Sequence, residues 1–160
     1  VSVQTLVLLS AYTLKRYIGG IRTDGSSQIL AFIQDGDYFR LAASVLDVST
    51  TNPGTSAVTR TFTVATGVNV YALINVRSTS TVVDTDVYLS DLAATDEVVS
   101  ITAAPLAQIG HLASGNEANW SGLIRTNISG QIRSRHRVSD GNTVFYIAIL
   151  GWDDRRGQNN

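Results

Sequence analysis

The sequence contains no cysteine and no methionine, and only two prolines in 160 residues. The absence of cysteine excludes disulfides, thiolate nucleophiles and cysteine-ligated zinc or iron–sulfur sites. Because the chain has no methionine, we interpret it as a fragment or a mature chain, in which Val1 is a processed terminus or the edge of a fragment. The opening run VSVQTLVLL has no preceding basic residue and is too short to cross a bilayer, so we expect neither a signal peptide nor membrane insertion.

Charge of either sign is also scarce. Lysine and arginine total 12 and aspartate and glutamate total 13, which leaves a formal net charge of −1 at pH 7. A nearly neutral chain has no overall attraction for nucleic acid or for an anionic membrane. The aromatic residues do not interleave with the basic ones in a base-stacking pattern either. We therefore expect no nucleic-acid partner.

Alternation of apolar and polar residues is the strongest pattern in the chain, and it predicts strands. In the segment TRTFTVATGVNVYALINV, two strands with a turn near Thr66-Gly67 fit best. Their predicted core positions are Phe62, Val64, Val70, Ala72, Ile74 and Val76. The run from Val144 to Leu150 is almost continuously apolar, which predicts a central strand covered on both faces.

Turn sequences divide the chain at intervals typical of a β-sandwich. They are Asp24-Gly25-Ser26-Ser27, Asp35-Gly36-Asp37, Asn52-Pro53-Gly54 and Asp140-Gly141-Asn142. One short helix is predicted from Leu106 to Ala113, after Pro105. No linker interrupts the chain, and its length allows one self-sufficient core. We predict a single all-β domain over residues 1–160, an antiparallel β-sandwich that is jelly-roll-like and has at most one short helix.

One stretch of the chain occurs twice. The sequence IRTDGSSQI, residues 21–29, returns as IRTNISGQI at residues 124–132. Each copy contains turn-forming residues, so we predict one hairpin at each place. The two hairpins could occupy related positions in the two sheets of a pseudo-symmetric sandwich. The alternative is that the copies merely share turn chemistry.

The context of the first copy, AYTLKRYIGGIRTDGSSQILAFIQDGDYF, resembles a segment that recurs in tail-fibre and other virion proteins of tailed bacteriophages. The matching residues are Tyr12, Lys15, Arg16, Ile18, Gly19, Ile21, Arg22, Thr23, Asp24, Gly25, Ser26, Ile29, Phe32, Gln34, Gly36 and Asp37. The stretch IRTNISGQIRSRHRVSDGNTVFYIAILGWDDRRG is similar to the end of such proteins, and NPGTSAVTRT adds to the likeness.

The resemblance implies a component of a phage particle, assembled in the bacterial cytoplasm and located in the virion. It also implies a homo-oligomer, with a trimer preferred because phage fibres are usually trimers. In the family a longer, variable N-terminal region that we expect to attach to the virion usually precedes this segment, and this sequence lacks it. Position on the particle is therefore not implied.

Residues suited to catalysis are sparse. The only histidines are His111 and His136, and the only glutamates are Glu97 and Glu117. The sequence has no Gly-x-Ser-x-Gly, phosphate-loop or His-Glu-x-x-His motif. We predict no enzyme activity, no catalytic residue and no cofactor.

Metal ligands are the next candidates. Three close carboxylate pairs could bind a hard cation, namely Asp35 with Asp37, Asp84 with Asp86, and Asp153 with Asp154. None has the spacing of an EF-hand loop, and aspartates in turns usually bond to backbone. We predict no metal site.

The most distinctive charged pattern lies in QIRSRHRV. Alternation places Arg133, Arg135 and Arg137 on one face of a strand. The opposite face carries Ile132, Ser134, His136 and Val138. Three neighbouring guanidinium groups require acceptors, and pairing within or between subunits is our favoured interpretation. The acidic candidates within the chain are Asp84, Asp86, Asp91, Asp96 and Glu97. The alternative is recognition of phosphate or acidic sugar groups on a bacterial surface.

Two tryptophans complete the candidates. Trp120 lies in the polar stretch NEANWSG, where its indole could stack on a sugar or anchor a loop on the core. Trp152 follows the apolar terminal strand, and we interpret it as a plug that closes the core. Arg155 and Arg156 follow it and are candidates for pairing across a subunit interface.

Taken with the resemblance, these patterns predict a non-enzymatic structural or adhesive module, most consistent with a tail fibre or related appendage that presents loops to a host-surface glycan. Neighbouring virion proteins are the other expected partners. The first alternative is a capsid decoration or head-fibre protein that contacts only virion proteins. The second is an enzyme that trims surface polysaccharide.

Overall fold

The computed structural model describes residues 19–82, 85–110 and 117–155, and these ranges contain strands and loops but no α-helix. No helix in the described ranges is therefore long and apolar enough to span a membrane. The strands are β1 (Phe32–Asp35), β2 (Tyr38–Thr51), β3 (Val58–Thr61), β4 (Tyr71–Thr79), β5 (Val87–Asp91), β6 (Glu117–Arg125), β7 (Gln131–His136) and β8 (Val144–Asp153).

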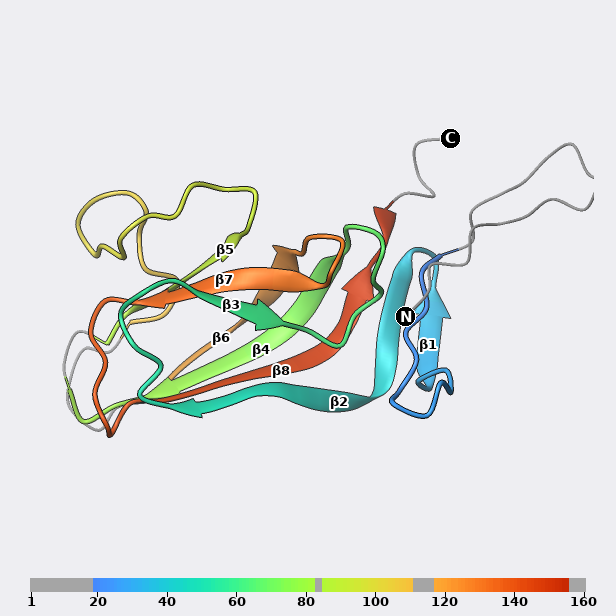
Figure 1. Cartoon of the computed structure of the whole chain (residues 1–160), viewed down its shortest axis with the longest axis horizontal. Helices are drawn as coiled ribbons and strands as arrows, with labels where there is room; N and C mark the ends of the chain where they lie inside the picture. The colour runs from blue at the N-terminus through green and yellow to red at the C-terminus, as the bar shows by residue number, and fades with distance from the viewer. Residues whose placement is uncertain (1–18, 83–84, 111–116, 156–160) are drawn as a thin grey trace, which may run out of the picture.

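Two antiparallel sheets pack face to face, which confirms the predicted all-β sandwich (Figure 1). The larger sheet has the order β1-β2-β8-β4-β6, and the smaller has the order β3-β7-β5. From β2 onward, successive strands alternate between the sheets, as in a jelly roll. Beside β5, where a jelly roll has a fourth strand, the described residues make one antiparallel bridge, between Val87 and Ile109.

The core fills the space between the sheets with the inward-facing side chain of every second residue. All six core positions predicted between residues 62 and 76 are buried. At one end of the core the indole of Trp152 is fully buried and stacks on Phe39, with ring centroids 5.5 Å apart. Trp152 therefore closes the core, as predicted.

Strand β8 is central in the five-stranded sheet, but the predicted burial of both its faces is wrong. Phe145, Ile147 and Ile149 are fully buried, whereas Tyr146, Ala148 and Leu150 are partly exposed. The reason is that a sandwich has only two layers, so each sheet keeps one outer face in contact with water. The outer side chains of β8 are apolar or aromatic without being covered by another described element.

The connections differ from the predicted hairpins. The turn near Thr66-Gly67 joins β3 to β4, which belong to different sheets, so it is a crossover rather than a hairpin. The predicted helix is absent from its described part: Leu106 is exposed, and Ile109 bridges to β5. Residues 111–113 of that prediction lie outside the described residues.

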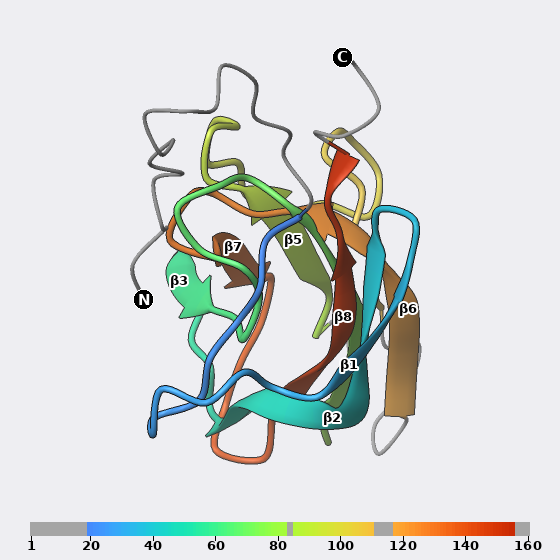
Figure 2. The same ribbon diagram turned by 90° about the vertical axis from the view of Figure 1, so that its right-hand side faces the viewer.

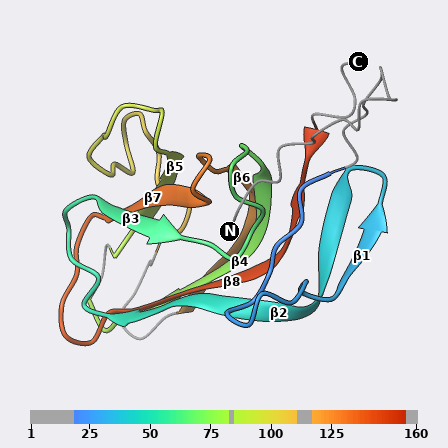
Figure 3. The same ribbon diagram turned by 45° about the vertical axis from the view of Figure 1, so that its right-hand side comes forward.

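Strand β2 changes direction along its length. Its register against β8 shifts between Arg40 and Val45 and again between Leu46 and Val48. Such bulges bend a strand and increase its twist. As a result, the first part of β2 turns away from the sandwich and carries the hairpin partner β1 with it (Figure 3).

The two copies of the repeated stretch form the same turn at two different places in the fold. Oδ1 of Asp24 accepts the backbone N–H groups two and four residues further on, at 2.8 and 2.9 Å. Oδ1 of Asn127 accepts the equivalent two, both at 2.9 Å. The third residue after each carries a positive φ, 64° at Ser27 and 71° at Gly130. The repeated sequence thus encodes a shared turn.

Each copy forms a turn, as predicted, but the two copies do not occupy related positions in the two sheets. The first copy is a small loop closed by a bridge between Thr23 and Ile29, next to the edge of the larger sheet. The second copy carries the chain from β6 in one sheet to β7 in the other. Shared turn chemistry, the alternative interpretation, accounts for the repetition without sandwich symmetry.

Candidate functional site

The outer face of the five-stranded sheet carries polar and aromatic side chains in aligned rows. Strand pairing places Leu46, Ala148, Asn75 and Ser121 in one row across β2, β8, β4 and β6. The next row holds Ser49, Tyr146, Arg77 and Asn119. On β4 and β8 these residues alternate with buried neighbours, so the rows exist because the other face of the same strands builds the core.

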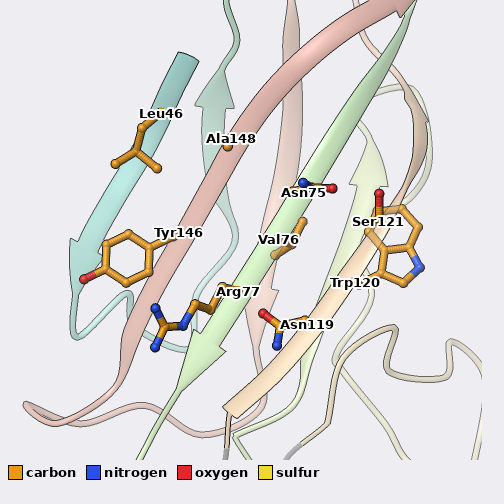
Figure 4. A pocket seen from close by; sticks show the side chains of 9 residues that line it. All are labelled: Leu46, Asn75, Val76, Arg77, Asn119, Trp120, Ser121, Tyr146 and Ala148. Carbon is orange, nitrogen blue, oxygen red and sulfur yellow. The ribbon is translucent and has the colours of Figure 1, made fainter. Parts of the chain in front are cut away.

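A depression of about 500 Å³ lies over these rows. Ala148 contributes only a methyl group, so the surface is low between Tyr146 and Leu46 on one side and Asn75 on the other (Figure 4). Its remaining lining comes from Val76, Arg77, Asn119, Trp120 and Ser121. The depression is shallow and open, and its nine lining residues include no carboxylate.

Hydrogen bonds hold one end of the depression in place. Nη2 of Arg77 lies 2.8 Å from Oε2 of Glu117, and Nδ2 of Asn119 donates to Oε1 of Glu117 at 3.1 Å. The side chain of Arg77 is 51% exposed, so this pair orients the guanidinium more than it stabilises the fold. The side chains of Asn75, Ser121 and Tyr146 have no hydrogen-bond partner in the described ranges and are available to a ligand.

Trp120 is placed differently from the prediction of a polar loop. It lies within β6 opposite the buried Val76, and it packs half-buried against the core. Its ring covers Gly122, where an added Cβ would come within 2.5 Å of the indole. Trp120 is therefore an anchor on the core, which was one of the two interpretations drawn from the sequence. Its side chain also borders the depression.

The arginine row has the predicted geometry. Arg133, Arg135 and Arg137 lie on the outer side of the three-stranded sheet, while the residues between them are buried. Arg133 and Arg135 share Asp96, at 3.8 and 2.9 Å, and Arg137 Nε lies 2.6 Å from Oδ2 of Asp86. All three therefore have acidic partners within the chain, as the favoured interpretation required.

The acidic partners were only partly foreseen. Of the candidates named from the sequence, Asp86 and Asp96 pair with the row, Asp84 lies outside the described residues, and Asp91 pairs instead with Arg125. Burial alone would raise the pKa of Asp91. However, the N–H of Ala93 and the hydrogen bond and charge of Arg125, together with the charge of Arg133, lower that pKa below its usual value.

Arg155 also finds its partners within the chain. Its Nε donates to Oδ2 of Asp153 at 2.7 Å, and its guanidinium lies 5.0 Å from the ring centre of Tyr71. The hydrogen bond to Asp153 raises the pKa of Arg155 above its ordinary value. Arg156 lies outside the described residues. No group of three or more potential metal ligands gathers within the described part of the chain.

The depression was missed by reasoning from the sequence. Alternation already placed Asn75 and Arg77 on the face of β4 opposite the core. What the sequence did not show is that β4 lies between β8 and β6, which brings Tyr146 and Asn119 beside them. Comparison with known proteins adds no further guide, because no protein-family model and no curated protein matches this chain.

Proposed function

We propose that this chain is a non-enzymatic structural and adhesive module of a bacteriophage particle, part of a tail fibre or related appendage, and that it contacts a glycan on the bacterial surface. The assignment to a phage particle rests on the sequence resemblance. The observation that carries the adhesive role is the open depression on the outer face of the five-stranded sheet, lined by an aromatic ring and by polar side chains that have no partner among the described residues.

The lining of the depression suits an uncharged sugar. The amide of Asn75 and the hydroxyl of Ser121 can each exchange hydrogen bonds with sugar hydroxyls, and the ring of Tyr146 offers an apolar face for C–H groups. The charge of Arg77 is already balanced by Glu117. A shallow site of this kind binds weakly, but many copies on one particle would add their affinities through avidity.

The depression is better suited to binding than to hydrolysis. Glycoside hydrolysis requires two carboxylates that flank the scissile bond, and none of the nine lining residues supplies one. The depression therefore favours the adhesive role over a polysaccharide-trimming enzyme.

One observation supports the alternative of a contact with another virion protein. Beyond the depression the same face carries exposed apolar side chains, among them Tyr71 and Leu123, which are 36% and 42% exposed. An apolar region beside a polar one is common at protein interfaces. A decoration protein that contacts only virion chains would use this region and leave the depression without a glycan.

A glycan array of bacterial surface polysaccharides tests the proposal. Tyr146→Ala should lower binding at least tenfold, because it removes the only aromatic ring on the outer side of the depression. Tyr88→Ala is the matched control, since Tyr88 is a half-buried tyrosine on the outer side of the other sheet. Equal loss in both variants, or no binding by the unmodified chain, would overturn the adhesive role.

A further inference from the structure

Strand β6 is an open edge of the five-stranded sheet. It pairs with β4 on one side, and no other strand of the described residues pairs with its far side (Figure 2). The backbone N–H of Thr126 donates to Val70 O at 2.8 Å, and these residues continue the register of the β4–β6 ladder. Because ladder bonds alternate, even-numbered residues of β6 point their backbone groups at β4. The N–H and C=O groups of the odd-numbered residues therefore point to the open side.

This edge lacks the features by which proteins usually protect edge strands. Its nine residues pair with β4 without a bulge, and residues 118–124 contain no charge and no proline. An uncharged, regular edge of this length is a template for pairing with another strand.

When two copies of β6, EANWSGLIR, are aligned antiparallel, the side chains that face each other are complementary in size and charge. We propose that two copies of the chain pair antiparallel through β6, with the twofold axis at Ser121. In this register every residue of the strand has a partner, and the opposed pairs are Glu117 with Arg125, Ala118 with Ile124, Asn119 with Leu123, Trp120 with Gly122, and Ser121 with itself. The odd-numbered residues, whose backbone groups point to the open side, oppose one another and form the hydrogen-bonded pairs.

Side-chain size supports this register on the core side of the strand. Trp120 opposes Gly122 of the other copy twice, once on each side of the axis. Even-numbered residues form the non-hydrogen-bonded pairs, in which side chains approach most closely. Because each Trp120 already covers Gly122 of its own copy, the two rings would lie side by side across the axis with no side chain from Gly122 between them. A shift of the axis by one residue would place Trp120 against Trp120 or Gly122 against Gly122.

Charge supports the same register at the ends of the strand. Glu117 of each copy lies opposite Arg125 of the other, so both ends bring unlike charges together. Within one copy, Arg77 already contacts Glu117, and Asp91 already contacts Arg125. The dimer would therefore join two ion pairs at each end rather than bury an isolated charge.

The dimer has a direct consequence for the depression. Asn119 and Ser121 line it from β6, so the depressions of the two copies would lie side by side on one continuous sheet face. An isologous contact of this type closes with two copies. It therefore yields a dimer rather than the trimer that the sequence resemblance implied.

Single cysteines test the register, because the natural chain has none. At the axis, the two Cα atoms of residue 121 would be about 5.5 Å apart, which is within disulfide range. Oxidation of Ser121→Cys with copper phenanthroline should yield a covalent dimer. Leu123→Cys is the control, since the Cα atoms of its two copies would be separated by roughly 14 Å. Cross-linking of Leu123→Cys at an equal rate would overturn the register.

The mass of the unmodified full chain, measured by light scattering over a range of concentrations, tests the dimer itself. A Ser121→Lys variant places two like charges face to face at the axis and should weaken dimerisation at least tenfold. Asn75→Lys adds the same charge to the same face one strand away and should change the dimer dissociation constant less than about twofold. A monomer, a trimer, or equal weakening by both lysines would overturn the proposal.

Discussion

Asp86 and Arg137 form a partly buried ion pair beside strand β5. The carboxylate side chain of Asp86 is only 5% exposed, and the guanidinium of Arg137 is 26% exposed. A buried carboxylate that loses its partner keeps its desolvation cost, so removing one side of such a pair costs far more than removing a surface pair. Asp96, which Arg133 and Arg135 share, is 40% exposed and can be solvated by water if either arginine is lost.

Arg137→Ala should therefore lower the free energy of unfolding by about 3 kcal/mol. Arg135→Ala, the matched control from the same row, should lower it by about 1 kcal/mol or less. Urea denaturation at pH 7 measures both free energies of unfolding. All variants are compared at one protein concentration, because the stability of a dimer depends on concentration. Similar losses in the two variants would contradict the distinction between a buried and an exposed acceptor.

Ser27 holds a backbone conformation that costs a residue with a side chain more than it costs glycine. Its φ of 64° is matched by 71° at Gly130, the equivalent position of the second turn. Ser27→Gly should therefore raise the free energy of unfolding by about 0.5 kcal/mol. Glycine relieves the backbone strain of the folded state, and the greater entropy that glycine gives the unfolded chain offsets part of this gain.

The reverse change supplies the control for that prediction. Gly130→Ala should destabilise the fold by about 1–2 kcal/mol, because the left-handed conformation disfavours a Cβ. That Cβ would also lie 3.1 Å from the carbonyl oxygen of Phe62. Thermal unfolding of both variants measures the effects, and a Ser27→Gly variant that melts below the unmodified chain would refute the shared-turn account.

At the scale of elements, β8 carries a glycine where the backbone of β2 passes close to it. Gly151 pairs with Arg40, at the point where the register against β2 begins to shift. A Cβ at Gly151 would lie 2.2 Å from the carbonyl oxygen of Phe39 and 2.9 Å from Cα of Arg40. Both neighbours are backbone atoms of a paired strand, so the side chain cannot be accommodated by a change of rotamer.

Gly151→Ala should therefore destabilise the protein by about 3 kcal/mol, as the strands move apart to accept the methyl group. Gly141→Ala is the control, because no atom lies within 4 Å of the added Cβ in that turn. Its effect should stay within about 0.5 kcal/mol. Chemical denaturation measures both, and a Gly151→Ala variant as stable as Gly141→Ala would contradict the close approach of β2 and β8.

Elements also show how far the sequence could predict the fold. Local alternation identified the core positions of β4 and the apolar run of β8, because each strand buries one face whatever its neighbours are. The partners of the strands could not be predicted in the same way. Residues near Thr66 look like a hairpin turn, yet they cross between sheets, since strand order depends on contacts between residues far apart in sequence.

For the whole molecule, the sequence predicts site residues that lie on one strand but not those that the order of the strands brings together. The arginine row could be predicted because Arg133 and Arg135 alternate along a single strand. The depression could not, because Tyr146, Arg77 and Asn119 come from three strands that only the sheet order brings together. Trp120 was expected in a loop because its neighbours are polar, but an edge strand with one solvent-exposed face has the same composition.

Backbone amide NMR tests whether this chain contacts a glycan through the outer face of its five-stranded sheet. The chain would be titrated with the polysaccharide that gives the strongest array signal. A contact on this face predicts that chemical-shift changes gather at five lining residues of β4, β6 and β8, namely Asn75, Arg77, Asn119, Ser121 and Tyr146. Changes confined to the loops or to the three-stranded sheet, or no changes at all, would contradict it.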